Sequence, residues 1–252
     1  MHAAYKESIG MIGVLLGRFE QKWDHDGLSS AIGMMLILGV QVLLTPFYAL
    51  TMGKKGFVFR GKNYHYFCHW YNTTFDNERA VEVAIALNLL SEAKEKRVLE
   101  IGNVLSHYTN MKRDVLDKYE KGAGVIQQDV VNFTPSAKYD LIISISTLEH
   151  VGFDEEPKDP EKFAAAIKNV QSMLAPGGRL FFTIPIAYNP DAVTTLSENT
   201  LVENQYYFQR ISKGKWEETT KECALSHAFN TPYTFANAII ICLDGEGDSG
   251  QS

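Results

Sequence analysis

Acidic residues, a glycine and a histidine follow short apolar runs in this chain, and these are the residue types that could do chemistry. A carboxylate accepts two hydrogen bonds at once, and each is strengthened by its charge. An imidazole can exchange a proton near neutral pH. Groups of this kind suit the binding of a polar ligand and general-base catalysis. The residues are Glu100, Gly102, Asp117, Asp129, Glu149 and His150.

The elements that must position these residues are predicted to be the strands of an open α/β sheet. Apolar runs predict strands at residues 97–101, 113–117, 125–128, 139–146, 179–185, 206–211 and 235–243. Helices are predicted from Glu78 to about Ala93 and from the start signal Asp159-Pro-Glu161, with a turn at Ala175-Pro-Gly-Gly178. Ligands of open α/β sheets bind beyond the carboxyl ends of the strands, which is where the acids fall.

Several blocks of this pattern carry a family resemblance. The blocks are Val98-Leu-Glu-Ile-Gly102, Asp117, Asp129, Tyr139-Asp-Leu-Ile-Ile143, Leu148-Glu-His-Val151 and Leu174-Ala-Pro-Gly-Gly-Arg-Leu180. In this order they resemble the class I S-adenosylmethionine-dependent methyltransferases (type 11-like) over residues 78–243. The resemblance implies a Rossmann-like sheet of seven strands, mostly parallel with an antiparallel last strand. It also implies S-adenosylmethionine as the cofactor.

The resemblance further implies a role for each strand tip. Glu100, Gly102 and the adjoining Asn103 would form the loop beside the methionine part of the cofactor. Asp117 would accept hydrogen bonds from the ribose hydroxyls, and Asp129 would face the adenine amino group. Each acid has a plainer alternative, because Asp117 could only end a strand and Asp129 could only sit in a turn.

Five further residues are candidates for catalysis, substrate contact or cofactor binding. Glu149 and His150 would lie beside the transferable methyl group, with His150 as the base for a hydroxyl acceptor; the alternative is a histidine with no proton to move. Tyr188 and Asn189 are candidate substrate contacts. Arg79 could reach the cofactor carboxylate, or could pair on the surface with a neighbouring glutamate.

The first half of the predicted domain departs from the family pattern. Two glycines expected in the first loop are replaced by Val104 and Ser106, and a β-branched residue restricts close backbone approach. The interval from Gly102 to Asp117 leaves room for about two helical turns at most. No crossover helix fits between Asp117 and Val125. We therefore expect a trimmed first half.

The N-terminal segment differs in character from the rest of the chain. No charged residue occurs from Gly27 to Gly53, and residues 4–22 have amphipathic helical spacing. A hydrophobic helix at residues 28–50 is therefore predicted to associate with a membrane, and the basic residues that follow place the catalytic domain on the cytoplasmic side. The predicted organisation is 1–53 membrane-associating, 54–77 aromatic β-hairpin and linker, 78–243 methyltransferase-like, and 244–252 a disordered tail.

Net charge and cysteine content limit which partners and functions the sequence is compatible with. A net charge of −6 over 252 residues argues against nucleic acid, and three widely spaced cysteines predict neither a metal site nor a disulfide framework. The expected partner is a small-molecule, lipid or glycan acceptor. Two other function classes are alternatives: a methyltransferase-like scaffold without catalysis, which the lost glycines favour, and a nicotinamide oxidoreductase, whose Gly-x-Gly-x-x-Gly motif is missing after the strand at residues 97–101.

Overall fold

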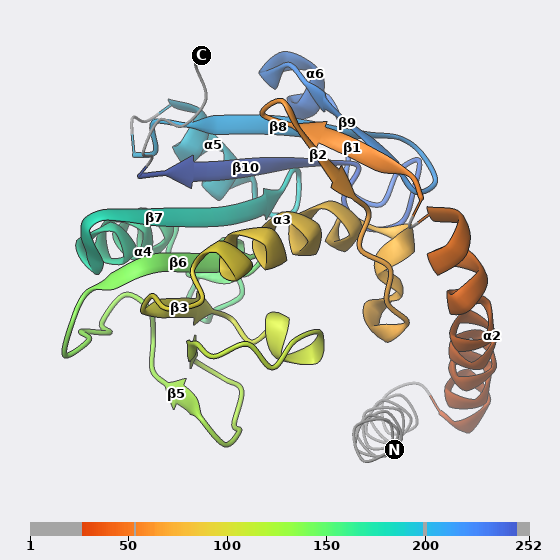
Figure 1. Ribbon diagram of the computed structural model, residues 1–252, viewed down its shortest axis with the longest axis horizontal. Helices are drawn as coiled ribbons and strands as arrows, with labels where there is room; N and C mark the ends of the chain where they lie inside the picture. Colours follow the sequence, from red (N-terminus) through yellow and green to blue (C-terminus); the bar gives the residue numbers. More distant parts are fainter. Residues whose placement is uncertain (1–26, 53, 199–200, 246–252) are drawn as a thin grey trace. The chain divides into compact units, whose positions relative to one another are not determined.

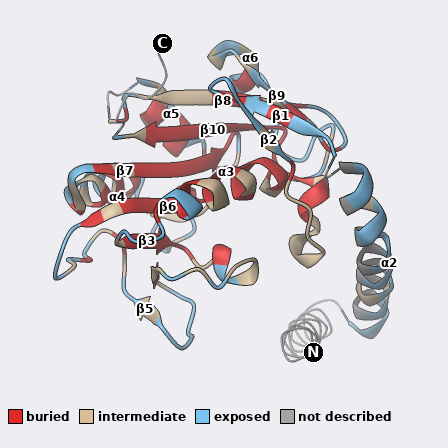
Figure 2. Ribbon diagram, viewed as in Figure 1, coloured by how far each residue is buried: buried red, intermediate tan, exposed pale blue. Residues whose placement is uncertain are grey.

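The computed structural model describes residues 27–52, 54–198 and 201–245. Contacts divide the chain into two compact units, Met1–Thr51 and Met52–Ser252. The expected apolar helix is present as α2 (Leu28–Met52). Figure 2 shows α2 pale blue over much of its length, and Leu36, Leu43 and Phe47 are 68%, 79% and 62% exposed. The predicted helix over residues 4–22 lies outside the described residues, as do residues 246–252 of the tail predicted to be disordered over 244–252. Asp244, the first residue of that predicted tail, instead ends the last strand, Ala238–Asp244.

A search of the described residues for membrane spans finds no helix with the necessary length and hydropathy.

The second unit is built around an eight-stranded sheet in the order β5-β4-β3-β6-β7-β10-β8-β9 (Figure 1). The strands are β3 (Val98–Ile101), β4 (Asp114–Asp117), β5 (Val125–Gln127), β6 (Tyr139–Ile145), β7 (Leu174–Pro185), β8 (Gln205–Ser212), β9 (Lys215–Thr219) and β10 (Ala238–Asp244). The strands from β5 to β7 are parallel, and β10 runs antiparallel between β7 and β8. This confirms the predicted Rossmann-like sheet with its antiparallel last strand.

The structure adds one strand to the seven that the resemblance implied. β9 pairs antiparallel with β8 at the outer edge, in a stretch where no strand was predicted. The short helix α6 (Lys221–Leu225) follows it, and α5 (Pro190–Glu198) follows β7; neither was predicted. β9 has one fully buried residue, Trp216, among polar and charged residues. This pattern is too short to distinguish a strand from a loop in the sequence.

The predicted turn at Ala175–Gly178 lies inside β7 rather than before it. The pairing with β6 jumps from Tyr139↔Leu174 to Leu141↔Arg179, so the intervening residues form a bulge. Gly177 has a φ of +72°, which glycine adopts without a Cβ clash. The Pro-Gly-Gly sequence therefore bends a continuous strand.

Helices cover both faces of the sheet. On one face, Phe163 and Ile167 of α4 (Glu161–Ser172) share a core with Ile142 and Phe182. On the other face, α3 (Arg79–Glu92) contacts β6 and crosses in front of the sheet in Figure 1. Side chains alternate between the two faces along each strand. The central strands therefore have both faces buried, as Figure 2 shows in red.

The predicted aromatic hairpin is β1 (Gly56–Phe59) paired with β2 (Lys62–His65). Phe57 and Phe59 each lie 5.9 Å, centroid to centroid, from the ring of Phe208 in β8. The hydroxyl of Tyr66 donates to the carbonyl of Trp216 at 3.1 Å and accepts from its N–H at 2.8 Å. The hairpin thus packs onto the β8–β9 end of the sheet.

The strands at the other end of the sheet are short and sparsely connected. A single 3-10 turn, η2 (Leu105–His107), interrupts the segment between β3 and β4. No helix lies between β4 and β5 among the described residues of that segment. The predicted trimming of the first half is confirmed.

Candidate functional site

A cleft of about 450 Å³ lies at the carboxyl ends of β3, β4 and β5. Parallel strands bring their carboxyl ends to one edge of the sheet, so residues distant in the sequence meet there. Its volume falls within the range of ligand pockets. The lining residues are Ile101, Gly102, Leu116, Asp117, Lys118, Tyr119, Glu120, Gln128, Asp129, Val130, Thr147, His150, Val151 and Glu155.

Backbone in the left-handed region marks three strand tips at this edge of the sheet. Gly102 follows β3 with a φ of +80°, Ser146 follows β6 with +39°, and Ala187 lies just beyond β7 with +64°. A Cβ at Gly102 would lie 2.3 Å from the hydroxyl oxygen of Thr147, so only glycine fits there. Strained backbone of this kind persists where the surrounding structure holds it, and it is frequent at binding sites.

The buried carboxylate of Glu100 holds the loop after β3 by hydrogen bonds. Its carboxylate is 1% exposed and accepts from the N–H of Leu105 at 2.6 Å and from Nε of Arg113 at 2.5 Å. Burial raises the pKa of Glu100, and Arg113 opposes that change. The structure therefore places Glu100 below the loop that borders the cleft, outside the lining.

Asn103 follows the cleft-lining Gly102 and carries an acceptor that has no hydrogen-bond partner among the described residues. Its amide nitrogen donates to the carboxylate of Glu120 at 2.8 Å. Its amide oxygen is buried, and no hydrogen-bond partner is found for it among the described residues. A buried acceptor without a donor costs free energy until a partner is supplied. This oxygen is a site where a bound amino or hydroxyl group could donate.

Asp117 lies at the tip of β4 and lines the cleft. One carboxylate oxygen, Oδ1, accepts from the N–H groups of Tyr119 and Glu120 at 2.8 and 2.7 Å. These bonds close the turn after the strand, as the plainer reading of Asp117 required. Oδ2 makes no hydrogen bond among the described residues, so the side chain can also receive a ligand hydroxyl.

Asp129 takes part in a four-charge network at the tip of β5. Its Oδ2 lies 3.0 Å from Nζ of Lys118 and 2.8 Å from Nζ of Lys162, and both ammonium groups also contact Glu155. Burial opposes ionisation of Asp129, but hydrogen bonds from Lys162 and from the N–H of Val131 lower its pKa to about 2. The acid is thus already paired, and sequence reasoning missed Lys118, Lys162 and Glu155.

Arg79 lies under the tip of β6, among buried carboxylates. Its Nη1 donates to Glu82 at 3.1 Å and to the carbonyl of Ile145 at 3.0 Å. Of the two expected alternatives, pairing with Glu82 is the contact found, but the Glu82 carboxylate is fully buried. Arg79 does not line the cleft.

Glu149 lies beside this buried group. One of its carboxylate oxygens, Oε2, is buried without a hydrogen-bond partner among the described residues. Burial raises the pKa of Glu149 well above its usual range, because removal from water disfavours the charged carboxylate.

His150 forms a three-residue contact with Asp154 and Tyr188. Its Nδ1 lies 2.5 Å from Oδ2 of Asp154 and 3.2 Å from the Tyr188 hydroxyl, which donates to the same carboxylate oxygen at 2.8 Å. A carboxylate only accepts, so Nδ1 carries the proton and Nε2 can accept one. The sequence analysis did not identify Asp154 as a site residue, although side chains four residues apart in a chain can contact each other.

Tyr188 and Asn189 have different positions. Tyr188 is half-buried and contacts His150, as described above. Asn189 is 2% exposed, donates to the carbonyl of Glu149 at 2.7 Å and accepts from the N–H groups of Asp191 and Ala192. The structure therefore uses Asn189 to start α5 and to tie it to the loop after β6.

The composition of the cleft fits S-adenosylmethionine. Its lining holds four acids, Asp117, Glu120, Asp129 and Glu155. The last two pair with Lys118 of the lining and with Lys162 beside it, which leaves two more carboxylates than ammonium groups. A surplus of carboxylates attracts a sulfonium cation. Within the lining, the second oxygen of Asp117 matches the cofactor's ribose hydroxyl donors. Asn103, whose buried amide oxygen has no hydrogen-bond partner among the described residues, adjoins the lining at Gly102. Asp129 fits less simply, because Lys118 and Lys162 already neutralise it.

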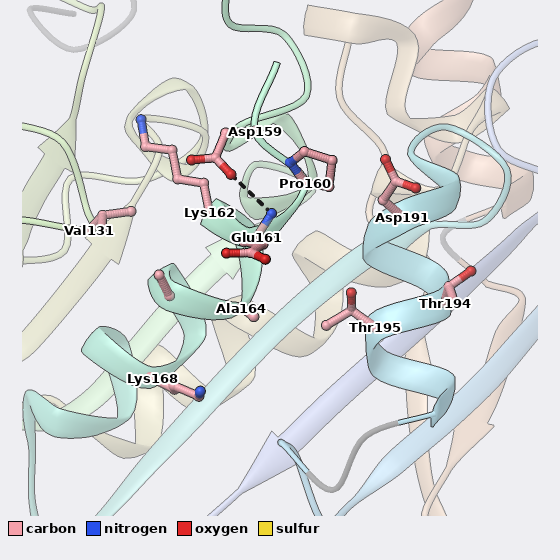
Figure 3. A pocket seen from close by; sticks show the side chains of 11 residues that line it. Val131, Asp159, Pro160, Glu161, Lys162, Ala164, Lys168, Asp191, Thr194 and Thr195 are labelled. Atoms are coloured by element: carbon pink, nitrogen blue, oxygen red, sulfur yellow. Dashed lines mark hydrogen bonds between the residues drawn. The ribbon is translucent and has the colours of Figure 1, made fainter. Parts of the chain in front are cut away.

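A second depression, of about 780 Å³, lies between α4 and α5 (Figure 3). Lys168 of α4 and Thr194 and Thr195 of α5 line it, and Figure 3 marks one hydrogen bond there, from the N–H of Glu161 to Asp159. It lies against helix surfaces, away from the tips of β3 and β4. We assign no function to it.

The known proteins to which this chain is similar are solved structures. No protein-family model and no curated protein matches the chain. Similar solved structures include the N-methyltransferase NodS from Bradyrhizobium japonicum WM9 in complex with S-adenosyl-l-homocysteine, at 15% identity and a TM-score of 0.39, covering 67% of this chain and 92% of that one.

Two more of the similar structures are TehB from Haemophilus influenzae and a methyltransferase from Thermotoga maritima. TehB is 12% identical with a TM-score of 0.42, covering 70% of this chain and 66% of that one. The Thermotoga protein, described as a possible histamine N-methyltransferase, is 14% identical with a TM-score of 0.40, covering 64% and 89%. The function proposed below rests on this chain's own strand order and cleft.

Proposed function

We propose that this chain is an S-adenosylmethionine-dependent methyltransferase that acts on a small-molecule acceptor. The observation that carries the proposal is the acidic cleft at the tips of β3, β4 and β5, in a sheet whose last strand is antiparallel. Bound S-adenosylmethionine would supply an electrophilic methyl group on a sulfonium. The protein has to bind the cofactor, align the acceptor and keep water out.

Four residues divide this work. The free oxygen of Asp117 accepts from ribose hydroxyls, and the amide oxygen of Asn103 accepts from the amino group of the methionine part. Gly102 lets the backbone approach closely where a side chain would strike Thr147. Nε2 of His150, with Nδ1 held by Asp154, accepts the acceptor's proton.

Calorimetric titration of the full chain with S-adenosylmethionine and with S-adenosylhomocysteine tests the proposal. We expect binding of both, and we expect Asp117→Ala to weaken it by more than about tenfold, because a charge-assisted pair of hydrogen bonds is lost. Asp191→Ala is the matched control, since Asp191 lies at the start of α5, away from the cleft. Unchanged affinity in Asp117→Ala would refute its role.

A catalytically inactive, scaffold-like domain is the second candidate. Val104 and Ser106 stand where the resembled family has glycines, and this observation favours it. The same titration separates the two candidates. Absence of heat and of a thermal shift at millimolar ligand would favour the scaffold, whereas binding followed by loss of the cofactor methyl group would favour the enzyme.

Membrane association of residues 28–50, with the catalytic domain on the cytoplasmic side, is part of the proposal. Exposed apolar side chains of α2, such as Leu43 and Leu50, support it, as do the basic residues Lys54 and Lys55 that follow. A lipid or lipid-linked glycan acceptor would fit that position. Flotation of the full chain with anionic vesicles tests the association, and protein that stays at the bottom of the gradient would contradict it.

A further inference from the structure

Three partly buried aromatic rings, those of Phe153, Tyr188 and Phe229, gather beside His150, and the proposed function uses none of them. Tyr188 is central: its ring centroid lies 4.9 Å from that of His150, 5.8 Å from Phe153 and 5.5 Å from Phe229, all at steep interplanar angles. These residues come from three separate segments, after β6, after β7 and before β10. The fold therefore assembles an aromatic surface next to the cleft.

A carboxylate shares this surface. Asp154 is 45% exposed in its side chain and accepts from both His150 and Tyr188. Burial opposes its ionisation, but the bonds from His150 and Tyr188 lower the pKa of Asp154, so it is charged at neutral pH. Rings with a fixed negative charge between them favour a cation over a neutral group.

The molecule itself shows that an ammonium group is stable here. Nζ of Lys158 lies 4.1 Å from the centroid of Phe153, over the face of the ring. Lys158 is exposed and lies on the same loop, so it can leave this position without unfolding any element. Its ammonium group occupies a position that a ligand ammonium could take.

We propose that the acceptor is an amine, bound as its ammonium ion by the rings of Phe153, Tyr188 and Phe229 and by the carboxylate of Asp154. The inference rests on the proposed function and names its substrate class. It replaces the hydroxyl acceptor that the sequence led us to expect. His150, in contact with both Asp154 and Tyr188, joins this ammonium site to the cofactor cleft.

The reaction balances with the groups present. The bound ammonium loses one proton to Nε2 of His150, and the freed nitrogen lone pair forms the bond to the methyl carbon. The bond from that carbon to sulfur breaks, and sulfur keeps the electron pair. His150 then returns its proton to solvent, while the product amine takes up or releases protons according to its own pKa.

Binding of matched probes to the full chain tests the inference, with and without S-adenosylhomocysteine. Choline carries a quaternary ammonium group, and the neutral dimethylbutanol with carbon in place of that nitrogen has the same shape. We expect choline to bind about tenfold more tightly, by nuclear magnetic resonance or calorimetry. Asp154→Asn should remove most of the difference, and Phe229→Leu should reduce it. Glu156→Gln, on the same loop, is the control and should retain it.

The outcomes separate the two proposals. Equal binding of the two probes, no choline binding at millimolar concentration, or an unchanged preference in Asp154→Asn would overturn the amine site. If S-adenosylhomocysteine binds in those cases, the proposed function stands with another acceptor. If choline is preferred but S-adenosylhomocysteine does not bind, the ammonium site stands and the methyltransferase function fails.

Discussion

The two ends of the sheet differ in how they are held together. At the cleft end, β3, β4 and β5 have three or four residues each, and loops held by side-chain hydrogen bonds connect them. At the other end, β7, β10 and β8 have seven to twelve residues, and the aromatic hairpin, α5 and α6 add to them. We infer that packing at the long-stranded end supplies stability, while polar bonds at the cleft end shape the site.

The largest effect that would test this division is expected from Arg113→Met. Arg113 is 4% exposed in its side chain and pairs with the buried Glu100. Removing one partner of a buried ion pair leaves an uncompensated charge, so we expect a loss of about 3–5 kcal/mol in the free energy of unfolding. S-adenosylhomocysteine binding should also be lost. Chemical denaturation and calorimetry measure the two effects.

The double variant Arg113→Met with Glu100→Leu is the control for that prediction. With both charges gone, stability should largely return, whereas binding should not, because the loop after β3 loses its hydrogen bonds. Recovery of both properties would show that Glu100 and Arg113 do not shape the cleft.

A dependence of stability on pH is expected from the buried acids between the two ends. Burial raises the pKa of Glu78 from 4.5 to about 7. The folded state therefore binds more protons than the unfolded state between these values, and stability falls as pH rises from about 4.5 to 7, by roughly 2–4 kcal/mol. Urea denaturation across this range measures it. Glu78→Gln should flatten the dependence, and an unaltered slope would assign it to other groups, Glu149 first among them.

At the long-stranded end, Tyr66→Phe should cost stability without affecting the cleft. The hydroxyl satisfies both backbone groups of the buried Trp216, and its loss leaves them unpaired. We expect a loss of about 1–3 kcal/mol. S-adenosylhomocysteine affinity should stay within about twofold of the parent. A larger loss of affinity would mean that the two ends of the sheet are coupled.

The smallest effect is expected from Lys62→Met. Its ammonium group lies 3.1 Å from the Glu92 carboxylate, and the two side chains are 51% and 41% exposed. Exposed pairs of this kind contribute less than about 1 kcal/mol. Chemical denaturation measures the change. A loss of more than about 1 kcal/mol in the free energy of unfolding would show that the hairpin depends on this contact with α3 more than on its buried aromatic rings.

Strand positions and the trimmed first half could be predicted because both depend on local sequence. Apolar runs identify strands such as β6, and the spacing from Asp117 to Val125 excludes a helix regardless of tertiary context. The bulge at Gly177 could not be predicted, because a Pro-Gly-Gly sequence has the same local signal at a strand start as inside a bent strand. β9 was not predicted, because its pairing with β8, rather than a pattern in its own sequence, stabilises it.

Site residues were predictable where they end strands, and were missed where their roles depend on partners far away in sequence. Asp117 and Gly102 line the cleft and were found from position alone. The pairing of Asp129 with Lys162, and that of His150 with Tyr188, joins segments more than thirty residues apart. Charge and burial in the folded chain decide such contacts, and a single sequence carries no record of them.

The two outer strands of the sheet have a consequence for self-association. An unpaired strand edge can act as a template for another chain, and length, flatness and apolar side chains increase that hazard. β5 has three residues, Val125–Gln127, too few to align a partner strand. β9 carries Lys215, Glu217 and Glu218 with one buried tryptophan between them. Both edges therefore oppose edge-to-edge aggregation of the folded domain. Shortness protects β5, whereas charge and the Tyr66 hydroxyl, which pairs with both backbone groups of Trp216, protect β9.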